Sequence, residues 1–178
     1  MSGDFLQRNY PDLHDQVAKL EKEGLLVRVK ERINKDTELH PLVRWQFRGG
    51  IEEHNRKAFL FENVTDSKGR HYDIPVVVGI MAANRQIYSL GIGCDLEKIG
   101  ERWREAKNNP IEPVEIPSSA APAHEIVFTG KDLDVPGQGV DGLPVPISTP
   151  GWDCSPYISA ANYITKDPDS GIQNVGNY

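Results

Sequence analysis

The sequence predicts an α+β fold, with a mixed helix–strand domain first and the start of an antiparallel sheet or barrel after it. Helical and strand patterns both occur before residue 108, without the regular strand–helix–strand alternation of a parallel α/β protein. Prolines at 110, 113, 117 and 122 then interrupt any regular element. The final stretch carries a hairpin pattern, in which two β-favouring runs flank a turn. We therefore expect a domain at 1–108, a proline-rich linker at 109–123, and the incomplete first part of a second domain at 124–178.

Helices in the first domain are marked by apolar spacing and by capping residues. Leu13, Val17 and Leu20 fall at helical spacing between Asp12 and Gly24, which predicts a short amphipathic helix with a start and a stop signal. The other helices expected here are residues 38–47, capped by Asp36 or Thr37 and ended by Gly49 and Gly50; residues 84–90, capped by Asn84; and a longer helix capped by Asp95.

The strands expected in the first domain are residues 25–29, 58–64 and 74–80, with a turn at 66–70. The last of these strands is an apolar, β-branched run of the type found in buried strands. On the helix that follows Asp95, the side chains of Leu96, Ile99 and Trp103 form one apolar stripe. We expect this stripe to lie in the core rather than to line a cofactor site.

The second region is expected to begin with a strand at 125–128 and to continue through a loop at 133–150 that is rich in glycine and proline. Such a loop is long for a simple connector, and long ordered loops are often functional. Asp153 follows this loop, and we interpret it as a turn residue rather than a catalytic acid.

The hairpin at the end of the sequence has an unusual second strand. Residues 157–166 and 172–178 are the β-favouring runs, and the turn between them contains residues suited to its backbone: Asp167, Pro168, Asp169 and Gly171. Asn174, Gly176 and Asn177 are poor strand formers, yet they occupy strand positions. They indicate either a strand whose backbone a ligand approaches closely or a frayed edge strand, and the pattern leaves both open.

Composition and motifs exclude several classes of function. The net charge of −6 argues against nucleic-acid binding, and neither a membrane-spanning run nor a signal peptide is recognisable. Cys94 and Cys154 are far apart and are expected to be reduced thiols, which together with the missing signal peptide predicts a cytoplasmic protein. No glycine-rich phosphate loop, nucleophile elbow or metal-spaced Cys/His cluster occurs, and the five scattered histidines are expected to be surface or satisfied residues.

Several stretches of the chain resemble the N-terminal part of the UbiD family of reversible decarboxylases. The resemblance begins with residues 12–29 and 59–64, and it continues through the loop at 143–146 and the residues at 150–152. It is most specific at 156–159, 164–171 and 173–178, the last of which reads Gln-Asn-Val-Gly-Asn-Tyr. It extends over nearly the whole chain but covers only the first part of a typical, much longer family member.

The resemblance implies a prenylated FMN cofactor whose phosphate is held through Mn²⁺ or Mg²⁺, with K⁺ close by. It implies an N-terminal α+β domain followed by a flavin-binding split β-barrel, of which this chain would hold the first part. It also implies an oligomeric lyase that decarboxylates or carboxylates aromatic or α,β-unsaturated acids.

Site residues follow from the same resemblance. Asn174 matches the asparagine that ligates the metal, and its amide oxygen is a hard, neutral donor. The other matches are the carbonyl of Val175 as a K⁺ contact, Ser159 near the cofactor phosphate, and Gly176, Asn177 and Tyr178 along the flavin.

The family's catalytic arginine, carboxylates and remaining metal ligands match positions beyond Tyr178, so we expect no catalytic residue in this portion and no activity from it alone. The partner is then the remainder of the enzyme or a second subunit. The alternative is a non-catalytic subunit or scaffold that keeps this domain for assembly.

Overall fold

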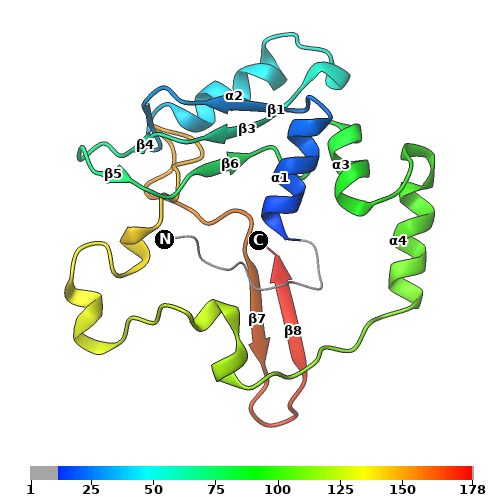
Figure 1. The fold of residues 1–178 in the computed structure, drawn as a ribbon, viewed down its shortest axis with the longest axis vertical. Helices are drawn as coiled ribbons and strands as arrows, with labels where there is room; N and C mark the ends of the chain where they lie inside the picture. The colour runs from blue at the N-terminus through cyan, green and yellow to red at the C-terminus, as the bar shows by residue number, and fades with distance from the viewer. Residues whose placement is uncertain (1–11, 178) are drawn as a thin grey trace.

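The computed structural model describes residues 12–177 and has a mixed α+β body from which a hairpin projects (Figure 1). Its helices are α1 (Leu13–Lys22), α2 (Leu39–Arg48), α3 (Arg85–Ile92) and α4 (Ile99–Asn108). Its strands are β1 (Leu26–Val29), β2 (Ile33–Asn34), β3 (Ala58–Phe61), β4 (Val64–Thr65), β5 (His71–Tyr72), β6 (Val76–Val78), β7 (Asn162–Lys166) and β8 (Gln173–Asn177). Short 3-10 helices occur at Glu53–Asn55, Leu96–Lys98, Ser118–Ala120, Pro122–His124, Gly130–Asp134 and Val140–Gly142.

The strands of the body form two small mixed sheets. In the first, β3 lies in the middle, parallel to β1 and antiparallel to β6; in the second, β4 is parallel to β2 and antiparallel to β5. The single strand predicted at 58–64 is therefore two strands, β3 and β4, which belong to different sheets. The break falls at residues 62–63, where the Glu62 N–H still bonds to Val29 and the Asn63 carbonyl already bonds to Ile33.

Buried apolar side chains form two clusters within the described residues. One lies under α1 and α3 and contains Leu20, Leu25, Ala58, Ile80, Ala83 and Ile87. The other packs α2 on the sheets and contains Ile33, Leu39, Val43, Phe61, Val64 and Tyr72. Both clusters come from the first half of the sequence, so the body holds the hydrophobic core of the described residues.

Helix caps agree with the sequence for α1 and α3 but not for α2. The Asp12 carboxylate accepts from the His14 and Asp15 N–H groups, and Asn84 accepts from the Ile87 N–H at 2.7 Å. Neither Asp36 nor Thr37 caps α2, because the N-cap residue is Glu38 and it makes no side-chain cap bond. The Asp36 carboxylate is used elsewhere: it pairs with Lys35 and accepts from the Ser67 N–H.

Two expectations of burial in the body were wrong. The predicted core stripe on α4 is not buried: Trp103 is 52% exposed, and its indole N–H donates to the Tyr88 hydroxyl at 2.7 Å. The cap predicted at Asp95 is also absent: this residue precedes the short 3-10 helix before α4 and makes no side-chain cap bond. The run at 74–80 forms only the three-residue β6, which is half-buried because it borders a cavity instead of lying between two layers.

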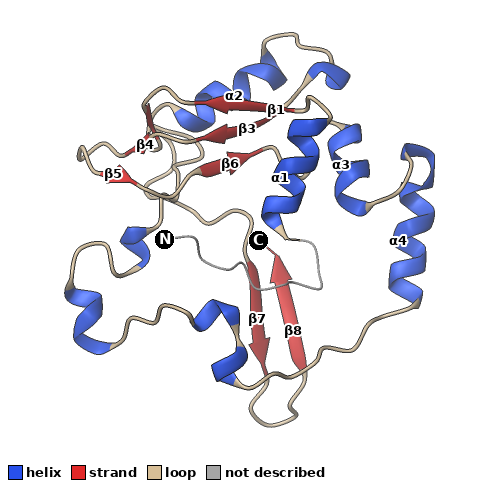
Figure 2. Ribbon diagram, viewed as in Figure 1, coloured by secondary structure: helices blue, strands red, loops and turns tan. Residues whose placement is uncertain are grey.

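Residues 109–161 contain no strand, and the strand predicted at 125–128 is absent (Figure 2). Ile126 and Val127 are 70% and 60% exposed, because no neighbouring segment pairs with this stretch in the described part of the chain. The final hairpin is present as antiparallel β7 and β8. None of the helices in residues 12–177 is long and apolar enough to cross a membrane.

Candidate functional site

The hairpin is closed by its turn in the manner that the sequence predicts. One oxygen of the Asp167 carboxylate accepts from the Asp169 N–H at 3.0 Å, and the other accepts from the Ser170 hydroxyl at 2.6 Å. Gly171 has a φ of 72°, which glycine adopts without strain. This local closure sets the register in which Lys166 faces Gln173 and Asn162 faces Asn177.

The poor strand formers lie in β8, where both faces are largely exposed. Asn174 pairs with Thr165 and Gly176 with Tyr163, so strand alternation puts Asn174 and Gly176 on one face and Val175 and Asn177 on the other. The Asn177 amide donates to the Asn162 side-chain oxygen at 3.2 Å, whereas the exposed Asn174 amide has no hydrogen-bond partner in residues 12–177. Tyr178 lies outside the described residues.

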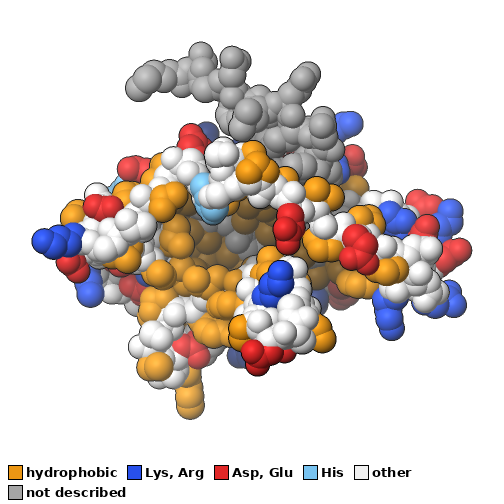
Figure 3. Space-filling model, turned by 90° about the horizontal axis from the view of Figure 1, so that it is seen from below, with side chains coloured by type: hydrophobic (Ala, Val, Ile, Leu, Met, Phe, Trp, Pro, Cys, Tyr) orange, Lys and Arg blue, Asp and Glu red, His pale blue; other side chains and the backbone are white. Residues whose placement is uncertain are grey.

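Ser159 lies at a separate place, on the wall of a cavity of about 710 Å³. The cavity is bounded by α2, residues 75–83, the loop at 143–146 and residues 157–160. Figure 3 shows the molecule from below, with hydrophobic side chains around a hollow. Because Ser159 precedes β7, it is near the end of the hairpin where Asn162 faces Asn177; Asn174 is three pairs further along, about 10 Å by strand rise.

One wall of the cavity carries basic residues that sequence reasoning missed. His40, Arg44 and Arg48 recur every fourth residue on α2, and this spacing was the available signal for a shared helix face. Arg44 donates to the Ser148 carbonyl at 2.7 Å and to the Thr149 hydroxyl at 3.2 Å, which holds that loop against α2.

His40 is half-buried beside this contact. Burial and then the Arg44 charge lower the pKa of His40, and the more weakly acting Asp153 opposes them, so His40 is neutral at pH 7. Asp153 itself accepts from the Thr149 N–H at 2.7 Å, as expected of a turn residue.

The described residues offer oxygen donors for a hard metal ion but do not complete a site. No group of three or more His, Cys, Asp or Glu side chains in residues 12–177 is arranged to hold a metal. On the Asn174 face of the hairpin, the neighbouring oxygen donor is the Thr165 hydroxyl, which is also neutral. Divalent cations such as Mn²⁺ are usually held by carboxylates or phosphates as well, so further ligands have to come from outside these residues.

A family model described as the 3-octaprenyl-4-hydroxybenzoate carboxy-lyase N-terminal domain matches residues 17–107. The chain is also 35% identical, over 187 aligned positions, to an uncharacterized protein of Aquifex aeolicus (strain VF5). That alignment covers 95% of this chain and 35% of the Aquifex protein.

Two solved structures are also similar to this chain. An evolved dimeric form of the UbiD-class enzyme HmfF from Pelotomaculum thermopropionicum, in complex with prFMN, has a TM-score of 0.72 and 29% identity, covering 91% of this chain and 34% of that one. Vanillic acid decarboxylase from Sedimentibacter hydroxybenzoicus (ShVdcCD), in open form with truncated ShVdcD, has a TM-score of 0.71 and 28% identity, covering 96% of this chain and 35% of that one.

The chain thus spans about a third of the length of these relatives. The family model covers more than half of the chain, and the structural likeness covers 91% of it. The chain belongs to the UbiD family of carboxy-lyases, and residues 17–107 are its family N-terminal domain.

Proposed function

We propose that this chain is part of a reversible decarboxylase that acts on an aromatic or α,β-unsaturated acid with prenylated FMN. The observation that best supports the proposal is the match of 91% of the chain, at a TM-score of 0.72, to a UbiD-class enzyme in complex with prFMN. A vanillic acid decarboxylase matches over 96% of the chain, which supports an aromatic acid as the substrate class.

We assign to the hairpin the task of anchoring the cofactor phosphate through Mn²⁺ or Mg²⁺. The exposed Asn174 amide oxygen, with the Thr165 hydroxyl opposite it, provides hard donors without a competing partner among the described residues. The carbonyl of Val175 would contact K⁺, and Gly176, Asn177 and Tyr178 would lie along the flavin. Ser159 would lie near the phosphate. Asn174 and Ser159 would then contact different parts of one extended cofactor, in keeping with their separation along the hairpin.

The chemistry limits what these residues do. Removing carbon dioxide from an sp² carbon leaves a costly carbanion, and the bound cofactor supplies the electron sink for it. The residues of this chain bind and orient that cofactor, whereas a proton donor and the substrate-binding cation are supplied by another polypeptide segment.

Exposed apolar side chains outside the body support the proposal that another protein segment packs against this chain. Beyond the body, large hydrophobic side chains are strongly exposed, including Ile111 (95%), Val114 (85%), Trp152 (88%) and Ile172 (70%). Packing of another protein segment against these stretches would bury such side chains. The covering segment would be the remainder of the enzyme or a second subunit, in a homo- or hetero-oligomer.

Replacing Asn174 tests the assignment in the native protein that contains residues 1–178. Asn174→Ala should lower bound manganese and bound flavin together, each by at least about tenfold, since even indirect supports of metal ligands typically contribute that much affinity. Gln173→Ala is the matched control, because Gln173 is exposed and on the opposite face of β8. Manganese is measured by elemental analysis and flavin by its absorption.

Unchanged manganese in the Asn174 variant would reject the metal assignment. Native protein that contains neither metal nor flavin, yet stays tightly associated with another subunit, would favour the non-catalytic scaffold instead.

A further inference from the structure

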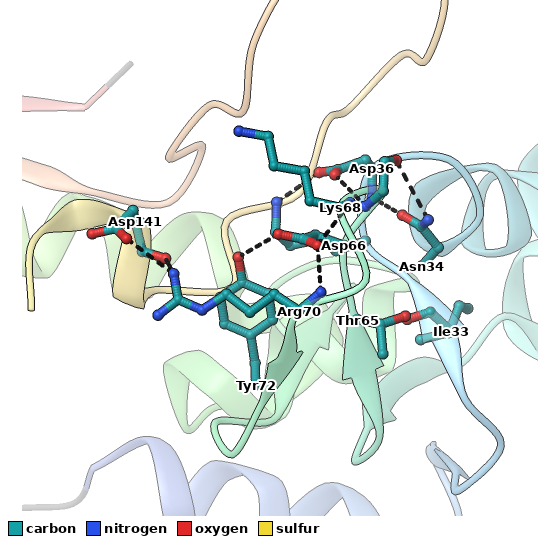
Figure 4. A network of polar contacts seen from close by, with 11 residues as sticks. Ile33, Asn34, Asp36, Thr65, Asp66, Lys68, Arg70, Tyr72 and Asp141 are labelled. Atoms are coloured by element: carbon teal, nitrogen blue, oxygen red, sulfur yellow. Dashed lines mark hydrogen bonds and ion pairs between the residues drawn. The ribbon is translucent and has the colours of Figure 1, made fainter. Parts of the chain in front are cut away.

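A network of polar contacts joins the body of the protein to the loop that precedes the hairpin (Figure 4). It brings together the residues after β2, the turn between β4 and β5, Tyr72 of β5, and the 3-10 helix at Val140–Gly142. Arg70 and Asp141, 71 positions apart, form an ion pair at 2.9 Å at the loop end of this network.

On the loop side, Asp141 organises a tight turn around the guanidinium. Its carboxylate accepts from the Gly137 N–H at 2.7 Å and the Gly139 N–H at 3.2 Å, and its carbonyl accepts from Arg70 at 2.9 Å. Gly137 has a φ of 92°, and a Cβ at this position would collide with the Arg70 guanidinium. The Gly137 N–H, and after it Arg70, lower the pKa of the Asp141 carboxyl, so this carboxyl is ionised at neutral pH.

On the body side, contacts with Tyr72 and Asp66 fix the position of Arg70. Its guanidinium lies 5.2 Å from the centroid of the Tyr72 ring, and the Tyr72 hydroxyl donates to Asp66 at 3.1 Å. The Asp66 carboxylate also accepts from the Lys68 and Arg70 N–H groups, both at 2.9 Å, and so closes the turn that carries Arg70. Tyr72 belongs to a core cluster, which ties this arrangement to the rigid body.

The loop continues from this contact to the hairpin. The Ile147 N–H donates to the Lys35 carbonyl at 3.3 Å, and the Tyr157 N–H donates to the Pro146 carbonyl at 3.3 Å. Residues 143–146 therefore lie between the end of β2 and the segment that enters β7, and they also form one wall of the cavity that contains Ser159.

The two core clusters do not include the hairpin. Neither core cluster of the described residues contains a side chain beyond Leu90, so apolar packing in these clusters does not hold β7 and β8 on the body. Polar contacts of the loop contribute instead: Arg70 makes two hydrogen bonds to Asp141, and Arg44 makes one each to Ser148 and Thr149.

We propose that the Arg70–Asp141 contact, with the turn at 137–141, is a latch that positions the β7–β8 hairpin relative to the body. Arg70 and Asp141 are positioning residues: they do not contact the cofactor, and they set its affinity through the loop at 143–147. This inference rests on the proposed function of the hairpin. It adds the Arg70–Asp141 contact, which lies outside the hairpin, as a determinant of cofactor affinity.

The test compares Arg70→Gln, Asp141→Asn and the double variant in the native protein. Arg102→Gln is the matched control, because it removes an exposed arginine–carboxylate pair of 2.7 Å that lies wholly within α4. Amide hydrogen exchange in residues 137–147 and 162–177 reports the position of the loop and hairpin without reference to any ligand. Flavin and Mn²⁺ titrations then report binding.

We expect faster exchange in both segments, a loss of flavin affinity of up to about fivefold, the usual upper effect of one exposed ion pair, and unchanged exchange of the body strands. The double variant should be no weaker than either single variant, since both break the same contact. Asp141 lies on an exposed loop away from both core clusters, so its variant keeps the fold even if the Arg70 variant does not.

Unchanged exchange in the Asp141 variant would overturn the latch. Faster exchange with unchanged flavin affinity would overturn the positioning role and leave the proposed function intact. A wild-type protein that binds neither flavin nor Mn²⁺ would overturn the proposed function, and the positioning role with it.

Discussion

Gln46 offers a sharp test of how α2 is attached to the sheet. It is a buried polar residue on α2, 5% exposed, and its side chain pairs with the backbone of Lys57 just before β3. The amide N–H₂ donates to the Lys57 carbonyl at 2.9 Å, and the amide oxygen accepts from the Lys57 N–H at 2.8 Å. Since α2 also provides a wall of the cavity, this pair helps to set the shape of the candidate site.

Replacing Gln46 by methionine removes both hydrogen bonds while keeping the volume and the helix propensity close to the original. Each lost bond costs about 1 kcal/mol, and a backbone group left without a partner in a partly buried place adds to that cost. Because Lys57 is only half-buried, water recovers part of the loss. We therefore expect the free energy of unfolding to fall by about 2–3 kcal/mol.

The assay is urea unfolding followed by far-UV circular dichroism. Leu42→Met is the control, because Leu42 lies on the same helix and is 44% exposed; its effect should stay within about 0.5 kcal/mol. Gln46→Glu adds a second arm: at neutral pH a carboxylate oxygen would face the Lys57 carbonyl, and protonation on acidification would relieve that repulsion. A Gln46→Met variant with an unchanged urea midpoint would refute the reasoning.

Three further predictions concern the core, the pH dependence and the isolated chain. Phe61 is fully buried, so Phe61→Ala should lower the free energy of unfolding by about 3–5 kcal/mol, whereas Ile111→Ala, at a 95% exposed position, should change it by less than about 0.5; equal urea midpoints would contradict this. Burial and Arg44 depress the pKa of His40 below its usual 6.5, so the unfolded chain takes up a proton at higher pH than the folded chain does. The free energy of unfolding is therefore largest above pH 6.5 and falls as the pH drops below 6.5. His40→Gln should make the urea midpoint less dependent on pH below 6.5. Residues 1–178 alone, mixed with prenylated flavin, Mn²⁺, K⁺ and a panel of aromatic acids, should release no carbon dioxide, because Asn174 and Thr165 are neutral donors and Mn²⁺ is usually held by charged donors as well; any release above the protein-free control would disprove it.

Elements defined by nearby residues were predictable from the sequence. The cap at Asp12, the cap at Asn84 and the hairpin turn after Asp167 all depend on side chains that bond to backbone within a few positions. Interactions of such short range are nearly independent of the rest of the fold. The poor strand formers of β8 stood out from their residue types, but their site roles come from the resemblance to the UbiD family and stay a prediction.

Elements that depend on a distant partner were not predictable from the same patterns. Residues 58–64 have one continuous strand pattern, but they divide between two sheets because β1 and β2 offer different partners. The apolar run at 125–128 has a strand-like composition and stays irregular, because no described segment pairs with it. Strand propensity expresses fit to a partner surface, which composition does not specify.

The sequence by itself determined the caps at Asp12 and Asn84, the hairpin turn, the mixed α+β character of the body, and the resemblance to the UbiD family that the comparisons then confirmed. The tertiary structure alone decided which side chains meet across long separations. Arg70 and Asp141 are 71 positions apart, and Arg44 and Ser148 are 104 apart. Periodicity reports which face of an element is apolar, but it contains no information on which distant polar groups will be brought within hydrogen-bonding distance. Those contacts depend on the packing of the body, which brings distant segments together.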